Sequence, residues 1–124
     1  MTNVYYTEEH EWMEVLEDDK VRIGITEFAQ EELGDIVYVE LPEKGDEFID
    51  GEEFGSVESV KSVSAIMTPV AGTVIAVNEA LEDEPELVND DATGEGWLIE
   101  LEMSGELDPD QLLSKEAYEE MIAE

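Results

Sequence analysis

The sequence predicts a mainly β domain, folded as a compact sandwich or barrel rather than a helical bundle. Short runs rich in Val and Ile, several of them alternating with polar residues, fill residues 20–103. Gly and Pro interrupt these runs at intervals of about ten residues, as in folds built from many short strands. The chain has 124 residues, which is enough for one hydrophobic core and too few for two ordinary domains. We therefore expect a single domain over residues 1–124.

The first half is predicted to contain strands on either side of one short helix. VRIGIT at residues 21–26 alternates apolar and polar side chains with the period of a half-buried strand. The Thr26 hydroxyl can cap a helix over EFAQEEL at 27–33, and Gly34 is placed to end that helix. DIVYVEL at 35–41 then predicts a further strand.

The second half is predicted to be mostly strand, followed by a helical tail. Residues 53–67 and 70–78 are rich in Val and Ile, and GWLIELEM at 96–103 predicts a late strand. DPDQ at 108–111 has the form of a capping box with Pro at the first helical position. We therefore expect a C-terminal helical segment at about 108–123, either one helix or two helices broken near Ser114. Its apolar residues at helical spacing are Leu112, Leu113, Ala117, Met121 and Ile122.

The composition is strongly acidic, with 36 Asp and Glu, five Lys and Arg, and a formal net charge of −31. The chain is nevertheless predicted to fold, because 42% of its residues are apolar and recur periodically. Concentrated salt screens such self-repulsion, so we expect a halophilic, salt-accumulating source. Without a basic patch, neither nucleic acid nor an anionic membrane is an expected partner. No membrane span or signal peptide is recognisable, which favours a cytoplasmic location.

Two patterns suggest chemistry but are not specific. His10 and Glu11 could act as an acid and a base, yet neighbours on a strand point to opposite faces. NDDATGEGWLIE matches positions 1, 3, 5, 6 and 12 of a calcium-loop pattern with Asn89, Asp91, Thr93, Gly94 and Glu100. The match is imperfect, because Asn replaces the first Asp and a strand follows where a helix belongs. We therefore predict no catalytic residue and no metal site from these patterns.

Lys61 is the residue that the charge pattern singles out. It is one of four lysines and lies among valines, next to Val60 and close to Val63. A solvated surface lysine needs no special role, and an ion pair with Glu58 would contribute little. Its amine can also be acylated, so the residues alone leave covalent modification as an open alternative. The chain has no cysteine, so any thiol chemistry must come from a cofactor.

Five motifs together resemble the glycine cleavage system H protein family over nearly the whole chain. In order they are HEW, GITEFAQEELGDIVYVELPEKGD, GSVESVKSVS, PVAGTVIAVN and GEGWLIELEM. The resemblance implies a flattened lipoyl/biotinyl-type β-sandwich, or hybrid barrel-sandwich, with a short helix in the N-terminal half and a C-terminal helix. It also implies that lipoic acid is attached to Lys61 as N6-lipoyllysine, at the tip of a lipoyl hairpin at about 55–77.

The function implied by this resemblance is a lipoyl carrier, a shuttle rather than an enzyme. The carrier takes an aminomethyl group from the pyridoxal-phosphate glycine decarboxylase (P protein) to the aminomethyltransferase (T protein). Dihydrolipoamide dehydrogenase (L protein) then reoxidises the arm, and a lipoyl-attaching enzyme loads Lys61 beforehand. A lipoyl-relay protein or another acyl or biotin carrier is the alternative. ESVK argues against a biotin carrier, whose lysine usually lies between two methionines.

The resemblance also assigns roles near the lysine. Glu58 and Ser59 are implied to be read by the lipoyl-attaching enzyme. Glu11 matches a family carboxylate near the loaded arm, where an acid could hold the aminomethyl ammonium. This chain departs from some relatives, which have Ser, His and Asp at the positions of Glu9, Glu32 and Ala65. The docking of the arm is therefore expected to differ in detail.

Overall fold

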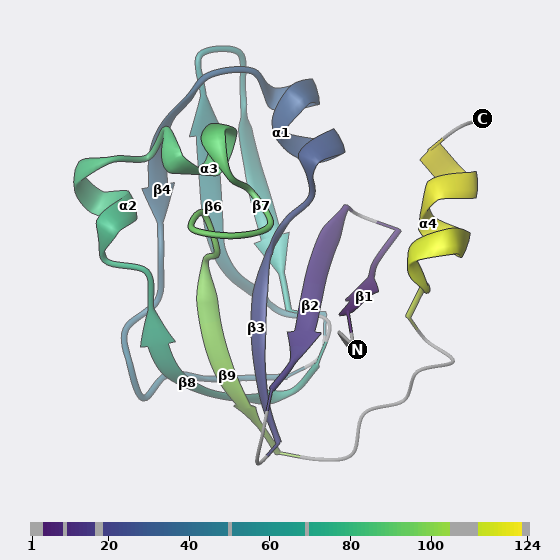
Figure 1. Ribbon diagram of the computed structural model, residues 1–124. Helices are drawn as coiled ribbons and strands as arrows, with labels where there is room; N and C mark the ends of the chain where they lie inside the picture. The colour runs from purple at the N-terminus through teal and green to yellow at the C-terminus, as the bar shows by residue number, and fades with distance from the viewer. Residues whose placement is uncertain are drawn as a thin grey trace.

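The computed structural model describes residues 4–8, 10–16, 19–49, 51–68, 70–104 and 112–122, and within them the fold is mainly β (Figure 1). The strands are β1 (Val4–Tyr6), β2 (Glu11–Val15), β3 (Lys20–Ile25), β4 (Ile36–Glu40), β5 (Glu47–Phe48), β6 (Glu53–Ser59), β7 (Val63–Met67), β8 (Gly72–Val77) and β9 (Ile99–Met103). The helices are α1 (Glu27–Leu33), α2 (Ala80–Asp83), α3 (Leu87–Asp90) and α4 (Lys115–Ile122).

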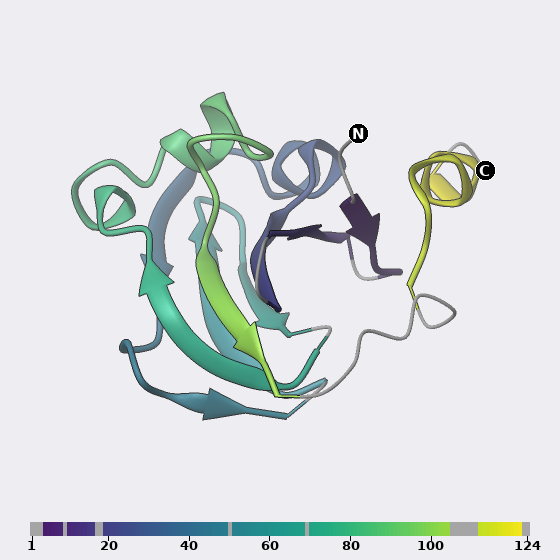
Figure 2. The same cartoon turned by 60° about the horizontal axis from the view of Figure 1, so that its bottom comes forward.

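The strands form two antiparallel sheets. The larger sheet has the order β1-β2-β3-β9-β8-β5, and the smaller has the order β4-β6-β7. The larger sheet curves around the smaller one, as the view in Figure 2 shows. The predicted mainly β sandwich is confirmed, and the sheets are not closed into one barrel.

The core lies between the two sheets and follows from the alternation in β3. Val21, Ile23 and Ile25 are at most 1% exposed, and cross-strand pairing places Ile23 opposite Ile99 of β9. The smaller sheet contributes Val57, which is fully buried. Burial of each such aliphatic side chain contributes about 1.5–3 kcal/mol, so this core holds the sheets as a fixed support for the loops at their ends.

Helix α1 forms as the sequence predicts. The Thr26 hydroxyl accepts a hydrogen bond of 3.2 Å from the Ala29 N–H, which caps the first turn. Gly34 ends the helix with a φ of +83°, and its N–H donates to the Gln30 carbonyl at 2.9 Å. Both ends of α1 are therefore set by local signals.

Of the two alternatives for the C-terminal segment, the described residues fit a break near Ser114, because Leu113 lies in a β-bridge and α4 follows Ser114. Helix α4 begins at Lys115, after Ser114, whose hydroxyl accepts a hydrogen bond of 3.2 Å from the Ala117 N–H. Leu113 is not helical, because its backbone pairs with Tyr6 of β1 through hydrogen bonds of 2.7 and 2.8 Å. The predicted capping box at 108–111 lies outside the described residues. In the part of the chain that the structure describes, no helix is long and apolar enough to cross a membrane.

Candidate functional site

Lys61 lies at the tip of the hairpin formed by β6 and β7, and the Ser59 side chain shapes this turn. The Ser59 hydroxyl accepts hydrogen bonds of 3.1 Å from the N–H groups of Lys61 and Ser62. The Ser59 N–H donates to the Ser62 carbonyl at 2.8 Å. The Ser59 side chain therefore stabilises this turn, which lacks the Asn-Gly pair found in many tight hairpins. The hairpin range predicted at about 55–77 also includes β8, which belongs to the larger sheet.

The surface around Lys61 is unusually apolar for this chain. Val60 and Val63 are 67% and 63% exposed. On the outer face of the smaller sheet, Tyr38 lies opposite Glu58, and Glu58 lies opposite Val63. Among the described residues, four of the five exposed large apolar side chains gather here: Val37, Tyr38, Val60 and Val63. Exposed apolar groups concentrated in one place favour contact with another protein.

The loop between α1 and β4 supports the hairpin tip. The Val60 N–H donates a hydrogen bond of 3.1 Å to the Asp35 carbonyl. The Lys61 side chain lies over Gly34, where a Cβ atom would come within 3.3 Å of the Lys61 Cε. Lys61 forms no salt bridge with any residue that the structure describes, so the pairing with Glu58 is not formed. The Lys61 side chain is exposed and its aliphatic stem lies beside Gly34.

A cleft of about 440 Å³ lies beside this loop, between α1 and β7. Its lining residues are His10, Ile25, Phe28, Ala29, Glu32, Leu33, Ser64 and Ile66. The cleft begins close to Lys61, because Leu33 precedes Gly34 and Ser64 follows the lysine by three residues. Glu32 is thus part of the cleft wall, whereas Ala65 is not among the lining residues and Glu9 lies outside the described residues.

Glu11 is buried next to the cleft instead of lining it. It is 3% exposed, and its carboxylate accepts hydrogen bonds from the Met67 N–H at 2.8 Å and the Thr7 hydroxyl at 3.4 Å. His10 lines the cleft, packs against Phe28 and has its polar contact with Tyr118. The two side chains that are adjacent in sequence therefore have separate surroundings. Strand alternation is not the cause, because His10 precedes β2 and has a φ of +69°.

The partner of His10 is Tyr118 of α4, which sequence reasoning missed. The Tyr118 hydroxyl lies 2.8 Å from the His10 Nδ1 and 2.6 Å from the Thr26 hydroxyl, and its ring stacks on Tyr6. Burial is the main cause that raises the pKa of Tyr118, and Tyr6 adds to the rise, while the Thr26 hydrogen bond opposes it. The pKa of Tyr6 is also raised, first by burial and then by the nearby Glu119. No local motif could reveal contacts over 108 residues.

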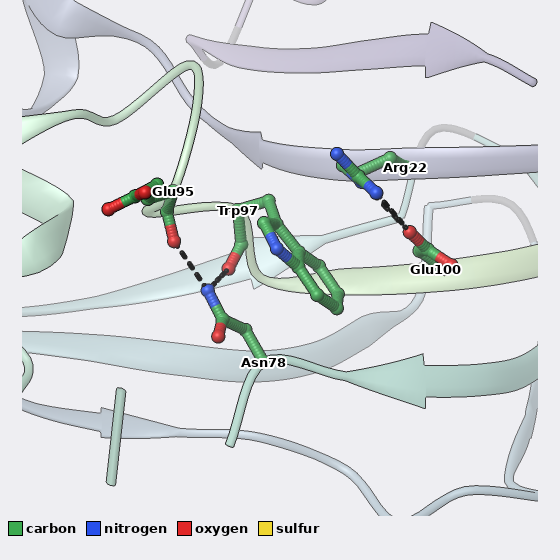
Figure 3. Close-up of polar contacts among 5 residues, drawn as sticks. All are labelled: Arg22, Asn78, Glu95, Trp97 and Glu100. Carbon is green, nitrogen blue, oxygen red and sulfur yellow. Dashed lines mark hydrogen bonds and ion pairs between the residues drawn. The ribbon is translucent and has the colours of Figure 1, made fainter. Parts of the chain in front are cut away.

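The side chains of Asn89, Asp91 and Glu100, three residues of the calcium-loop pattern, do not point to a common site. Glu100 accepts hydrogen bonds of 2.9 and 2.7 Å from Arg22, whose guanidinium lies over the Trp97 ring (Figure 3). The Asp91 carboxylate accepts from the Glu95 N–H at 3.0 Å, and Asn89 binds the loop after α1. Within the described ranges, no group of three or more His, Asp or Glu side chains is arranged to hold a metal ion.

Two facing antiparallel sheets with an exposed lysine at a tight hairpin tip define a carrier domain of the lipoyl/biotinyl class. The family model described as "Glycine cleavage H-protein" matches residues 4–124. The chain belongs to this family, whose members are the lipoyl carriers of the glycine cleavage system, and this carrier role is its function.

Individual relatives agree with this assignment. The glycine cleavage system H protein of Halalkalibacterium halodurans is 57% identical over 119 residues, covering 96% of this chain and 92% of the relative. A relative from the halophilic archaeon Natronomonas pharaonis, named a probable glycine cleavage system H protein, is 56% identical over 95% of this chain and 92% of its own. The crystal structure of the H protein from Mycobacterium marinum matches with a TM-score of 0.89 and 36% identity, covering 98% of this chain and 97% of that one.

Proposed function

We propose that Lys61 is the residue that carries the lipoyl group. The observation that carries this proposal is the position of Lys61, exposed at the tip of the β6–β7 hairpin and directly beside the cleft between α1 and β7. An amide between Nζ and the carboxyl carbon of lipoic acid removes the lysine charge. The absence of a salt bridge at Lys61 within the described residues fits this loss, because no paired carboxylate is left behind.

When attached, the lipoyl group would supply a disulfide that opens and is reduced as it accepts the aminomethyl group, and the dithiol left after transfer would be reoxidised by the dehydrogenase. The chain itself supplies a fixed anchor for a flexible arm. A tethered group has a high effective concentration at each partner, provided that the tether reaches the partner's active site. The hydrogen bonds of Ser59 within the turn and of Val60 to Asp35 hold that anchor in place. We therefore assign this chain a carrier role with no catalysis of its own.

The lipoyl-attaching enzyme has to contact the hairpin tip closely, since it must bring Nζ to the acyl carbon. Glu58 is exposed on the outer face, between Tyr38 and Val63, and is available to such an enzyme. Ser59 is 6% exposed and bonded within the turn, so its proposed part in recognition is to shape the turn. Glu58 and Ser59 thus act differently, one as a contact and one as a support.

The cleft beside Lys61 is the proposed docking place of the arm. Ile25, Phe28 and Ile66 give it an apolar wall suited to a hydrocarbon chain and a dithiolane. His10 and Glu32 are ionisable residues in the lining. Glu11 stays a proposed partner for the ammonium of a loaded arm, because its carboxylate lies against β7 at Met67. At 3% exposure it would have to turn out of its buried position to reach the arm.

The partners that we propose are the decarboxylase, the aminomethyltransferase and the dehydrogenase of the same system, together with the lipoyl-attaching enzyme. These follow from the family to which the chain belongs and from the apolar surface around Lys61. The proposed location is the cytoplasm.

Substitution of the lysine tests this function. Lys61→Arg keeps a cation and a long stem but cannot form the lipoyl amide. We expect Lys61→Arg to fold normally and to abolish glycine-dependent release of carbon dioxide in a system reconstituted with the P, T and L proteins. Lys44→Arg, which changes another exposed lysine away from the hairpin, is the matched control and should retain full activity. Activity in Lys61→Arg would overturn the proposal.

A further inference from the structure

We propose that Asn89 is a positioning residue for Lys61, which it places for lipoyl attachment although it does not touch the lysine. The inference rests on the proposed function, since it concerns the residue that accepts the lipoyl group. Asn89 lies on α3, and its amide has three hydrogen-bond partners on α1 and on the loop that follows it.

The Asn89 amide clamps this loop from both ends. Its Oδ1 accepts a hydrogen bond of 2.8 Å from the Ile36 N–H, and its Nδ2 donates to the Gly34 carbonyl at 2.8 Å. The same Nδ2 donates to the Gln30 side-chain oxygen at 2.9 Å, which ties the loop to α1. Both backbone bonds together fix the segment 34–36 relative to α3.

The clamped segment is the one on which the hairpin tip rests. Between the two residues held by Asn89, Asp35 presents the carbonyl that accepts the Val60 N–H at 3.1 Å. Gly34 lies beside the Lys61 stem: a Cβ atom added to Gly34 would lie 3.3 Å from the Lys61 Cε. Asn89 is thus linked to the hairpin tip in two ways. It bonds to Gly34, which lies beside the Lys61 stem, and it fixes both neighbours of Asp35, which accepts the hydrogen bond from Val60.

The β-sheet holds only one end of this loop, where Ile36 at the start of β4 pairs with Ser59. The register of β4 against β6 shifts between Ile36 and Tyr38, so regular pairing is interrupted next to the hairpin tip. The Ile36 N–H bonds to Asn89 at that place. An amide side chain, with an acceptor and two donors, can hold an N–H and a carbonyl of one loop at once. This is the geometric reason for asparagine at position 89.

Asn78 provides a control, because its side-chain amide also bonds to the backbone of a loop but lies elsewhere in the fold. It is 7% exposed, and its Nδ2 donates to the carbonyls of Glu95 and Trp97 at 2.7 and 2.8 Å (Figure 3). None of these partners belongs to the loop 34–36 or to the hairpin tip. Asn78→Ala therefore removes two partly buried side-chain hydrogen bonds without loosening the support of Lys61.

The experiment measures lipoyl attachment to the unmodified full chain by a lipoate ligase supplied with lipoate and ATP. Wild type, Asn89→Ala, Asn89→Asp and Asn78→Ala are compared at a temperature where circular dichroism shows each to be folded. We expect kcat/KM to fall about five- to tenfold for Asn89→Ala, since the loop loses its clamp. Asn89→Asp keeps the acceptor for Ile36 but loses both donors, so it should lie between Asn89→Ala and wild type.

Asn78→Ala should stay within about twofold of wild type in kcat/KM, even if its unfolding free energy falls as much as that of Asn89→Ala. Amide hydrogen exchange supplies a second readout: the Val60 N–H should exchange faster in Asn89→Ala and unchanged in Asn78→Ala. Equal attachment rates and equal Val60 exchange in the two alanine variants would overturn the inference. Wild type that takes up no lipoate under these conditions would overturn the proposed function, and the inference with it.

Discussion

The Lys61 side chain lies beside Gly34, where a Cβ atom would crowd it. A Cβ there would approach the Lys61 Cε to 3.3 Å, and the φ of +83° is one that side chains with a Cβ rarely adopt. Gly34 therefore both ends α1 and leaves room beside the Lys61 stem.

Gly34→Ala should affect both stability and modification. We expect a loss of about 1–3 kcal/mol in unfolding free energy, because alanine is strained at this backbone conformation. Lipoyl attachment should also slow, because the methyl group displaces the Lys61 stem. Gly51→Ala is the matched control, since Gly51 has the same φ of +83° and nothing within 4 Å of its Cβ position. If both variants accept lipoate at the same rate, the contact with Lys61 has no role in modification.

Glu11→Ala should destabilise the protein, because it leaves the partly buried Met67 N–H without the carboxylate that now accepts its hydrogen bond. The expected cost is about 1–3 kcal/mol of unfolding free energy, measured by urea titration. Glu11→Gln keeps an oxygen acceptor and should cost less. Glu14→Ala, which removes a half-buried carboxylate from the same strand, should change stability by no more than about 0.5 kcal/mol. Equal effects at the two positions would refute this account of Glu11.

Tyr118 should make stability depend on pH in the alkaline range. Because its pKa is raised above the ordinary value of 10.0, the folded state keeps the phenol proton at pH values where the unfolded state has lost it. The resulting contribution is complete below pH 10 and is lost as the pH rises through the folded-state pKa. Unfolding free energy measured in urea should therefore fall above about pH 10.

Tyr118→Phe should weaken this alkaline fall, although Tyr6, whose pKa is also raised, will retain part of it. The same change should cost about 1–3 kcal/mol at pH 7, since it removes the hydrogen bonds to His10 and Thr26. An alkaline slope identical in wild type and Tyr118→Phe would show that burial of this hydroxyl does not govern its titration.

Salt should stabilise the protein by screening its charge. With a formal net charge of −31, the folded state repels itself in dilute buffer. We expect the unfolding free energy to rise by at least about 1 kcal/mol between dilute buffer and 1 M KCl, where the Debye length is about 3 Å. Most of the rise should occur below 1 M. Equal stability at both salt concentrations, followed by circular dichroism, would contradict the interpretation of the acidic surface.

Features fixed by neighbouring residues were predictable from the sequence, and features fixed by distant ones were not. Helix α1 was predicted with both ends, because Thr26 and Gly34 act within one turn of it. The hairpin tip came from family resemblance alone, because the Ser59 turn contains no residue pair typical of tight hairpins. Leu113 was wrongly placed in a helix, because its pairing with Tyr6 involves a partner far away in sequence.

The candidate site follows the same rule. Lys61 was singled out by its charge and assigned by its motif, but its support by Asn89 was not foreseen. Asn89 was considered as the first position of a calcium loop, because its sequence neighbours are acidic. Its actual partners lie on α1 and on the following loop, 53 to 59 residues away. Spacing along the chain carries no information about contacts of this kind.

The most direct test of the central claim is the intact mass of the protein purified from cells that make lipoate, followed by peptide mapping. The account predicts one added lipoyl group, located on the peptide that contains Lys61, and no addition in Lys61→Arg. An unmodified Lys61 in cells with an active lipoate pathway, or an adduct of a different mass such as biotin, would contradict it.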